Sequence, residues 1–269
     1  MFMMTTTKIA DVFQYLDTLA PMERKLDFDN VGLLLGSMDQ SVGRILLALD
    51  ITDEVIDEAI QTQADLIISH HPLIFSPLKA VVESDMVGRK VLRLAQHGIG
   101  VICMHTNLDL APEGVNDVLA FALGLSEVKI LEQIAMHDGA AYGLGRYGQL
   151  AAEESMHSFL PFVKERLHTK GLRYHDAGRP VSRVAVMGGS GGDCLANVTA
   201  CDCDTYVVGE VKYHHFLEAK ERNINLIEAD HFCTEHLVLA PFGRSLEHEF
   251  PNLRVRVSEW HKQVAHFFV

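Results

Sequence analysis

The sequence has few of the features that mark secreted or membrane proteins. Its five cysteines are an odd number and lack the spacing of a disulfide framework, so we expect free thiols in a reducing cytoplasm. No apolar run approaches the roughly 20 residues that span a bilayer. The first residues show no charged start followed by an apolar core, so no signal peptide is visible. These absences predict a cytoplasmic protein without a membrane partner.

Positive charge is also scarce. The chain has 23 lysines and arginines against 36 aspartates and glutamates, which gives a formal net charge of −13 at pH 7. Duplex DNA is bound by clustered lysine and arginine at the phosphates, so we expect no duplex DNA partner. A nucleotide remains compatible with this charge, because a bound metal ion can supply local positive charge.

What is present is the composition of an ordinary globular protein, with 48% hydrophobic residues in a chain of 269. In the first half, apolar segments of strand character alternate with amphipathic segments of helical period. The predicted strands are 44–50, 66–69 and 99–105, and the predicted helices are 9–19, 53–62, 85–97 and 114–123. This alternation predicts an α/β fold with a mainly parallel sheet covered on both faces.

Alanine, glycine and turn residues between 133 and 148 mark a predicted boundary, after which a second unit of similar rhythm follows. Its predicted helices are 153–169, 194–200, 214–222 and 234–239, and its predicted strands are 181–187, 204–208, 225–228 and 253–257. We assign residues 1–128 and 226–269 to one α/β unit, which carries most of the metal-binding clusters described next. Residues 129–225 form the second α/β unit.

Fifteen histidines are many for this length, and several gather where predicted strands end. His70 and His71 follow the strand 66–69 and would point to opposite sides in an extended chain. Two neighbouring ligands therefore suit a place where the strand breaks into a turn, which Pro72 favours. Such a pair could bind two metal ions, one on each imidazole. The alternative is a polar strand end with two solvated histidines.

His105 and Asp109 follow the next predicted strand. Pro112 and Gly114 place the start of the following helix later, so we predict that both residues lie in a loop, where functional residues of α/β proteins commonly lie. The two oxygens of Asp109 could each bind one cation. Its alternative role is that of a turn or helix-capping aspartate.

His231 and Glu235 are four residues apart, and a helix is predicted from residue 234. That spacing places both side chains on one helical face, where they could reach the same ion. The alternative is a surface salt bridge, which the apolar neighbours make less favourable. Glu210 follows a strand and a glycine, with His214 one helical turn beyond. It could orient a ligand or transfer a proton, or cap the helix.

Together these strand-end clusters predict one metal site and a metal-dependent hydrolase. Mixed imidazole and carboxylate ligation suits Zn, Mn, Fe, Ni or Co. Divalent ions in such a site lower the pKa of a bound water, and His105 or Glu210 would transfer the proton. A non-catalytic metal-binding or partner-binding scaffold needs the same ligands but no proton-transfer residue. The acidic balance disfavours a nucleic-acid-interacting factor.

Two further patterns carry less information. The glycine-rich run 188–192 follows a predicted strand and favours a tight turn into a helix, with an anion-binding site as the alternative. It fits neither the dinucleotide nor the P-loop spacing. Cys194, Cys201 and Cys203 lack a fourth zinc ligand at a standard spacing.

Five motifs occur in an order that is familiar from one family. They are Asp29-Asn30-Val31-Gly32-Leu33, Ser69-His70-His71-Pro72-Leu73-Ile74-Phe75, His105-x-Asn107-x-Asp109, Asp204-x-Tyr206-Val207-x-Gly209-Glu210 and His231-Phe232-x-x-Glu235. With them, the sequence resembles the Nif-three-like family, whose members are often labelled GTP cyclohydrolase I type 2 homologues. The resemblance spans nearly the whole chain, and the combination of motifs is specific.

The resemblance implies a two-metal centre with His70, His71, Asp109, His231 and Glu235 as ligands. It also implies two interlinked α/β units with the metal site at strand exits between them, and a ring-shaped homohexamer whose metal sites face an internal cavity. The activity implied is opening of the guanine ring of GTP, or hydrolysis of another nucleotide or small heterocycle.

The chain departs from the family pattern in two places. A glycine is usual before the last histidine motif, whereas this chain has Asp230, which adds a carboxylate near the implied ligands. The segment Cys201-Asp202-Cys203 is also unusual at its position. The long central insertion of some members is missing here.

Overall fold

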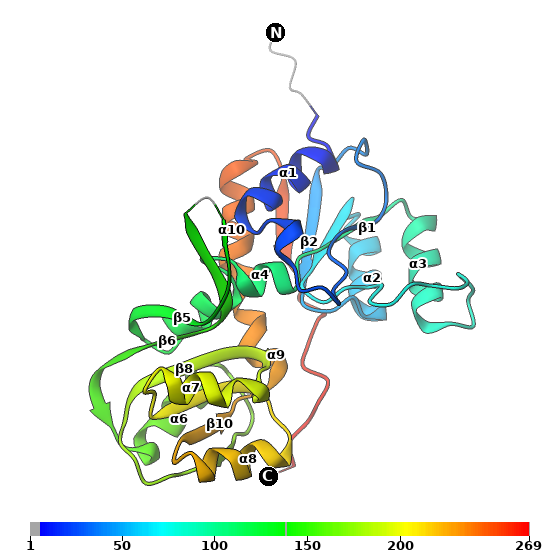
Figure 1. The fold of residues 1–269 in the computed structure, drawn as a ribbon. Helices are drawn as coiled ribbons and strands as arrows, with labels where there is room; N and C mark the ends of the chain where they lie inside the picture. Colours follow the sequence, from blue (N-terminus) through cyan, green and yellow to red (C-terminus); the bar gives the residue numbers. More distant parts are fainter. Residues whose placement is uncertain (1–5, 138, 269) are drawn as a thin grey trace. The chain divides into compact units, whose positions relative to one another are not determined.

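The computed structural model describes residues 6–137 and 139–268, which form two sheets in two compact units (Figure 1). Unit 1 comprises Met1–Leu108 and Leu239–Lys262, and unit 2 comprises Asp109–Val238 and Gln263–Val269. Each unit thus combines two separate stretches of the chain. The bounds differ from the division at 128/129 and 225/226 that the sequence suggests, and they put Asp109, His231 and Glu235 in unit 2.

The sheet of unit 1 has the strand order β1-β4-β3-β2-β11. Its strands are β1 (Gly32–Leu35), β2 (Arg44–Ala48), β3 (Leu66–Ser69), β4 (Gly100–Cys103) and β11 (Arg254–Val257). All neighbouring pairs are parallel except β1 with β4. The predicted parallel sheet is therefore present, and its last strand comes from the end of the chain.

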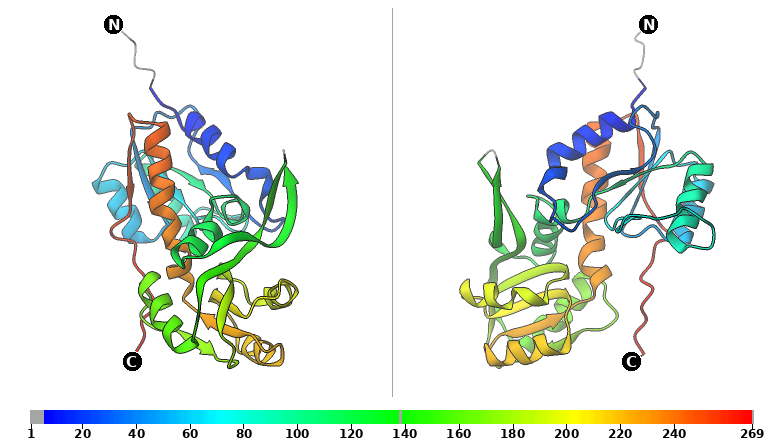
Figure 2. Two further views of the ribbon diagram at one scale, coloured as in Figure 1. Left: turned by 90° about the vertical axis from the view of Figure 1, so that its left-hand side faces the viewer. Right: turned by 45° about the vertical axis from the view of Figure 1, so that its right-hand side comes forward.

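Helices cover both faces of this sheet (Figures 1 and 2). They are α1 (Ile9–Leu19), α2 (Asp53–Gln61), α3 (Met86–Gln96) and α10 (Leu239–Glu249), with the short α4 (Thr106–Leu110) and the 3₁₀ turn η1 (Met22–Arg24) beyond the strands. Leu46 and Ile67 pack with residues of α2 and α3 in one core. On the opposite face, Gly243 of α10 lies against Leu47, and Gly100 lies against Ile9 of α1.

The sheet of unit 2 has the order β5-β6-β8-β9-β10-β7 and is mixed rather than mainly parallel. Only β8 with β9 and β9 with β10 are parallel. The strands are β5 (Ser126–His137), β6 (Ala140–Glu154), β7 (Arg173–His175), β8 (Val181–Ser190), β9 (Thr205–Glu210) and β10 (Asn225–Glu228). The α/β class is confirmed in both units, with antiparallel strands added at the edges of this second sheet.

Two separate cores cover the faces of the second sheet. Its helices are α5 (Val115–Ala122), α6 (Met156–Arg166), α7 (Leu195–Ala200), α8 (Tyr213–Glu221) and α9 (His231–Glu235), with the 3₁₀ turns η2 (Gly192–Cys194) and η3 (His236–Val238). Phe159 of α6 packs with Val207 on one face. On the other face, Leu195 of α7 packs with Tyr206.

The predicted boundary at 133–148 is wrong, because this stretch belongs to the long hairpin of β5 and β6 (Figure 2). Its glycines allow neighbouring strands to approach. A Cβ at Gly143 would lie 2.2 Å from the carbonyl oxygen of Glu132, and one at Gly148 would lie 2.6 Å from that of Ser126. Small residues here therefore reflect close backbone packing and not a linker.

The sequence prediction also misses α10 and β7 and treats α4 as a loop. Helix α10 contains Pro241 and Gly243, two residues that usually indicate the end of a helix. Pro241 is the third residue of α10, where no intrahelical acceptor is available for an N–H. A Cβ at Gly243 would lie 3.1 Å from the side chain of Leu47, so the glycine permits close helix–sheet contact.

No helix in the described part of the chain is both long and apolar enough to cross a membrane. All five cysteines are free, as predicted. Burial raises the pKa of Cys194 to about 12, with a smaller contribution from Glu132, and burial likewise raises the pKa of Cys203 to about 12 against the opposing effect of Arg183. Both thiols form part of the apolar core of unit 2.

A buried carboxylate ties the end of unit 1 to its second helix. Glu58 of α2 is only 6% exposed. It accepts hydrogen bonds from the hydroxyl of Ser258 and from the backbone N–H groups of Glu259 and Trp260, the latter two at 3.0 and 3.1 Å. The carboxylate thus fixes the segment that follows β11.

We predict that Glu58→Ala lowers the free energy of unfolding by about 3 kcal/mol, because three donors lose their acceptor in a buried place. Glu58→Gln keeps one acceptor oxygen and should cost about half as much. Urea unfolding checks both values, with the exposed Glu54→Ala in the same helix as control. Equal stabilities of Glu58→Ala and Glu54→Ala would contradict the anchoring role.

Candidate metal centre

Three imidazoles face one another in unit 1. His70 and His71 follow β3, and His105 follows β4. Their ring centroids are 5.1 to 5.5 Å apart, and one nitrogen of each ring lies within 4.8 Å of the others. The two strands are parallel neighbours, so their carboxyl ends bring these residues together. The group could hold a metal ion, and it contains two of the predicted ligands, His70 and His71, beside His105, the predicted proton-transfer residue.

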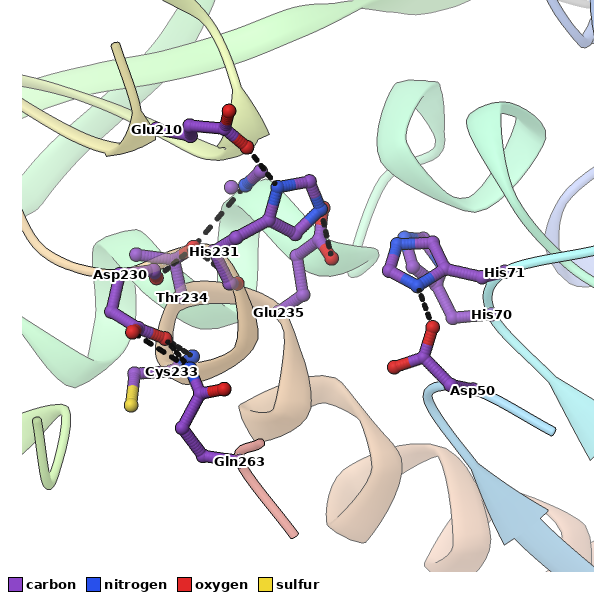
Figure 3. A network of polar contacts seen from close by, with 12 residues as sticks. Asp50, His70, His71, Glu210, Asp230, His231, Cys233, Thr234, Glu235 and Gln263 are labelled. Carbon is purple, nitrogen blue, oxygen red and sulfur yellow. Dashed lines mark hydrogen bonds and ion pairs between the residues drawn. The ribbon is translucent and has the colours of Figure 1, made fainter. Parts of the chain in front are cut away.

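The orientation of each ring is fixed at Nδ1. His70 is buried, and its Nδ1 lies 2.8 Å from the backbone carbonyl oxygen of Met104. The Nδ1 of His71 lies 2.7 Å from Oδ1 of Asp50 (Figure 3). A carbonyl or carboxylate oxygen only accepts, so both rings carry their proton on Nδ1. Their Nε2 atoms therefore keep the lone pair that binds metals.

His105 has the same arrangement. Its Nδ1 lies 2.8 Å from Oδ1 of Asp29, whose side chain is fully buried. The other carboxylate oxygen of Asp29 accepts hydrogen bonds from the N–H and the hydroxyl of Thr106. Burial alone raises the pKa of Asp29, but the hydrogen bonds from His105 and Thr106 outweigh it and hold the pKa well below its usual value. Asp29 is therefore an ionised acceptor.

Asp50 is ionised for a similar reason. Burial raises its pKa, but hydrogen bonds from His261 and His71 together lower the pKa well below the usual value. The negative charge increases the basicity of the imidazole that it contacts. Neither Asp29 nor Asp50 was assigned a role from sequence, because each lies far along the chain from its histidine.

In unit 2, His231 and Glu235 form the second half of the predicted ligand set. They lie one turn apart on α9, with Nε2 of His231 3.2 Å from Oε2 of Glu235. Two ligands of one tetrahedral zinc ion are about 3.3 Å apart at ordinary bond lengths. Nδ1 of His231 lies 3.1 Å from Oε2 of Glu210 (Figure 3). Glu210 therefore orients His231. His231 and Glu235 together form a candidate pair of metal ligands.

The glycine run makes room for Glu235. A Cβ at Gly189 would lie 2.1 Å from Oε1 of Glu235, and Gly189 has a φ of +63°. Further along the run, a Cβ at Gly192 would lie 2.0 Å from the ring of His215. The sequence prediction of a turn or an anion site at 188–192 misses this role, because the side chains that approach the glycines are distant in sequence.

Asp109 lies in α4, so the predicted loop at this point is wrong. Its backbone carbonyl accepts a hydrogen bond of 3.0 Å from the amide of Asn116, whose own carbonyl oxygen accepts from the N–H of Gly188. The buried Arg146 donates to the carbonyl oxygen of Ala111 at 3.0 Å. These bonds fix the backbone on which the half-buried Asp109 side chain stands.

Other predicted candidates lie elsewhere. His214 is exposed on α8, and its ring meets that of His215 edge-on, with the ring centroids 4.1 Å apart. Across residues 6–137 and 139–268, no group of three potential metal ligands includes a cysteine. The structure thus brings His70, His71 and His105 together in unit 1, and Glu210, His231 and Glu235 together in unit 2.

Sequence comparison identifies the family. The family model described as Duf34/NIF3 (NGG1p interacting factor 3) matches residues 7–263 of the chain. The chain belongs to the Duf34/NIF3 family. It is 34% identical over 233 residues to a GTP cyclohydrolase 1 type 2 homolog of Clostridium perfringens, covering 86% of this chain and 88% of that protein. A homolog of the same name from Streptomyces coelicolor is 34% identical over 260 residues, with 94% and 91% covered.

The fold agrees as well. The Staphylococcus aureus hypothetical protein SA1388 superposes with a TM-score of 0.91 at 30% identity, over 98% of this chain and all of that one. The Nif-three-like resemblance that the motifs indicate is therefore confirmed, both for the family and for the two-sheet α/β fold.

We predict that Asp29→Asn lowers the free energy of unfolding by about 2 kcal/mol at pH 7, since an amide replaces an ionised acceptor. The folded-state pKa of Asp29 is depressed, so its contribution is present above the unfolded-state pKa of about 4 and is lost as pH falls below it. Wild type and variant should converge in acid. Urea unfolding from pH 7 to pH 2 checks this, with the exposed Asp27→Asn as control. A pH-independent difference would refute it.

Proposed function

We propose that this Duf34/NIF3 protein is a hydrolase that binds two divalent metal ions through His70, His71, Asp109, His231 and Glu235. The observation that supports it best is the shared orientation of the histidines. In His70, His71 and His231, Nδ1 lies against an oxygen acceptor, which is the arrangement by which proteins orient the Nε2 of a metal-binding histidine. Neutral imidazole and carboxylate suit Zn, Mn, Fe, Ni or Co.

The donor set fits such ions chemically. Carboxylates supply negative charge at Asp109 and Glu235, while the three histidines supply nitrogen ligands. The half-buried Asp109 can offer two oxygens, as a residue shared by two ions requires. When bound, the ions supply Lewis acidity and lower the pKa of a coordinated water.

Two residues remain for proton transfer. His105 stands among the imidazoles of unit 1, and Asp29 fixes its tautomer, so its Nε2 accepts a proton in a general-base step. Asp29 then stabilises the protonated ring by its negative charge. Glu210 is 60% exposed and contacts His231, so it both orients that ligand and exchanges protons with water.

The substrate that we propose is a purine nucleotide or another small heterocycle, opened by water with loss of a one-carbon unit in the case of GTP. Support comes from the names of the relatives, GTP cyclohydrolase 1 type 2 homologs, and not from a described pocket. The family resemblance further supports a homohexamer in the cytoplasm as the working form.

Metal content is the direct test of this centre. We predict close to two ions per wild-type chain by mass spectrometry, and fewer than one in Asp109→Ala and Glu235→Ala, since each removes a carboxylate ligand. The exposed Glu247→Ala on α10 serves as control and should keep both ions. A metal-free wild-type chain that takes up no ion on addition would rule out the proposed centre.

Activity separates an enzyme from a non-catalytic metal-binding scaffold, which uses the same ligands. We predict that His105→Ala lowers kcat for nucleotide ring opening by 10²- to 10⁴-fold, as is typical for loss of a general base. Its metal content and oligomeric state should persist, and the exposed His214→Ala is the control. Formate release from GTP is the assay. Full metal loading without turnover of any nucleotide tested would favour the scaffold.

A further inference from the structure

The six residues that follow β11, Ser258 to Gln263, contact polar residues next to two of the proposed metal ligands. Glu58 anchors the start of this segment through Ser258, Glu259 and Trp260. The boundary between the two units falls at its end, after Lys262. The segment contributes no ligand of its own to the proposed centre.

His261 holds the carboxylate that orients His71. It is 6% exposed, and its Nδ1 accepts a hydrogen bond of 3.3 Å from the N–H of Leu49. Its Nε2 lies 3.1 Å from Oδ2 of Asp50 and 3.4 Å from the backbone nitrogen of the same residue, and because a carboxylate oxygen only accepts, the shorter contact requires the proton on Nε2. Oδ1 of Asp50 contacts Nδ1 of His71 at 2.7 Å. The side chain of Asp50 is 44% exposed, so without His261 it could rotate toward water.

Two residues later, Gln263 contacts Asp230, the residue that precedes helix α9. Its amide nitrogen lies 2.6 and 2.7 Å from the two carboxylate oxygens of Asp230 (Figure 3). Asp230 is the N-cap of α9 and directly precedes His231, and its carboxylate accepts from the N–H of Cys233 at 3.0 Å. The side chain of Asp230 is thus held between the helix and Gln263.

Asp230 has an unfavourable backbone conformation, so its contact with Gln263 helps to hold the chain in place. Its φ of +76° with ψ of 130° is unfavourable for any residue with a Cβ. Such a conformation persists only when the surroundings hold it. The carboxylate contacts from Cys233 and Gln263 supply that hold at the point where the chain turns into the helix that carries His231 and Glu235.

We infer that the segment Ser258–Gln263 is a positioning element of the metal centre, which fixes His71 through the contact of His261 with Asp50 and fixes helix α9 through the contact of Gln263 with Asp230. This inference rests on the proposed function, because it concerns residues that orient the proposed ligands. His261 and Gln263 are positioning residues, and neither touches a metal or a substrate.

The test is a titration of the metal-free, full-length protein with Co²⁺, followed by its visible absorption. Wild type should take up two ions. His261→Ala and Gln263→Ala should each weaken one of the two sites by about 10- to 100-fold, the usual effect of removing a residue that orients a ligand, and shift its absorption band. The exposed His266→Ala and Gln96→Ala are matched controls and should behave as wild type.

A second variant separates positioning from general stability. Glycine adopts the backbone conformation of Asp230 without strain, so Asp230→Gly should retain both Co²⁺ sites. In that background Gln263→Ala should have no further effect. An equal loss of affinity in both backgrounds would overturn the action of Gln263 through Asp230. Likewise, His261→Gln keeps an N–H donor and should recover the affinity lost in His261→Ala, even if the alanine variant folds poorly.

The outcomes distinguish this inference from the proposed function. A wild type with two Co²⁺ sites and unchanged spectra in folded His261→Ala and Gln263→Ala overturns the inference and leaves the metal centre standing. A wild type that binds no Co²⁺ overturns both. Circular dichroism of each variant establishes that it is folded.

Discussion

A neutral imidazole has one N–H and one lone pair, and the position of its proton decides which nitrogen can bind a metal. In this protein an oxygen acceptor lies at Nδ1 of His70, His71, His105 and His231, and at His231 a second carboxylate oxygen, from Glu235, lies 3.2 Å from Nε2. Three of the acceptors are carboxylates and one is a backbone carbonyl. The orientation of the whole candidate centre depends on these four contacts, because without them each ring could turn or change its tautomer.

The rest of the structure keeps these acceptors in place. Parallel pairing of β2, β3 and β4 brings the residues that follow their carboxyl ends to one edge of the sheet, which is why Asp50, His71 and His105 meet. In unit 2, β8 and β9 are likewise parallel, and glycine at position 189 leaves the space that Glu235 occupies. The pairing of the strands thus decides which residues lie near one another in each unit. The absence of a side chain at glycine allows the close contact with Glu235.

Local sequence patterns were sufficient to predict several helices and strands of this fold. The helix at 9–19 and the strands at 66–69 and 225–228 were predicted with the bounds that they have, because their apolar residues follow one period. His70 and His71 were chosen as candidates because they directly follow a predicted strand, and β3 ends at Ser69. The hairpin of β5 and β6 was missed, since glycine indicates both a loop and a close approach of strands. The contact between Asp50 and His261 spans 211 residues, and no local pattern predicts it.

The division of the chain also sets the order in which the protein can be completed during synthesis. The sheet of unit 2 has all its strands once residue 228 has left the ribosome, whereas unit 1 gains its edge strand β11 only at residues 254–257. Until α10 has been made, the part of the first sheet around Leu47 lacks the helix that packs against it, although α1 already lies on the same face. The nascent N-terminal half therefore exposes part of an incomplete core while the later half already has its full set of strands, and apolar surface exposed in this way favours aggregation of an unfinished chain.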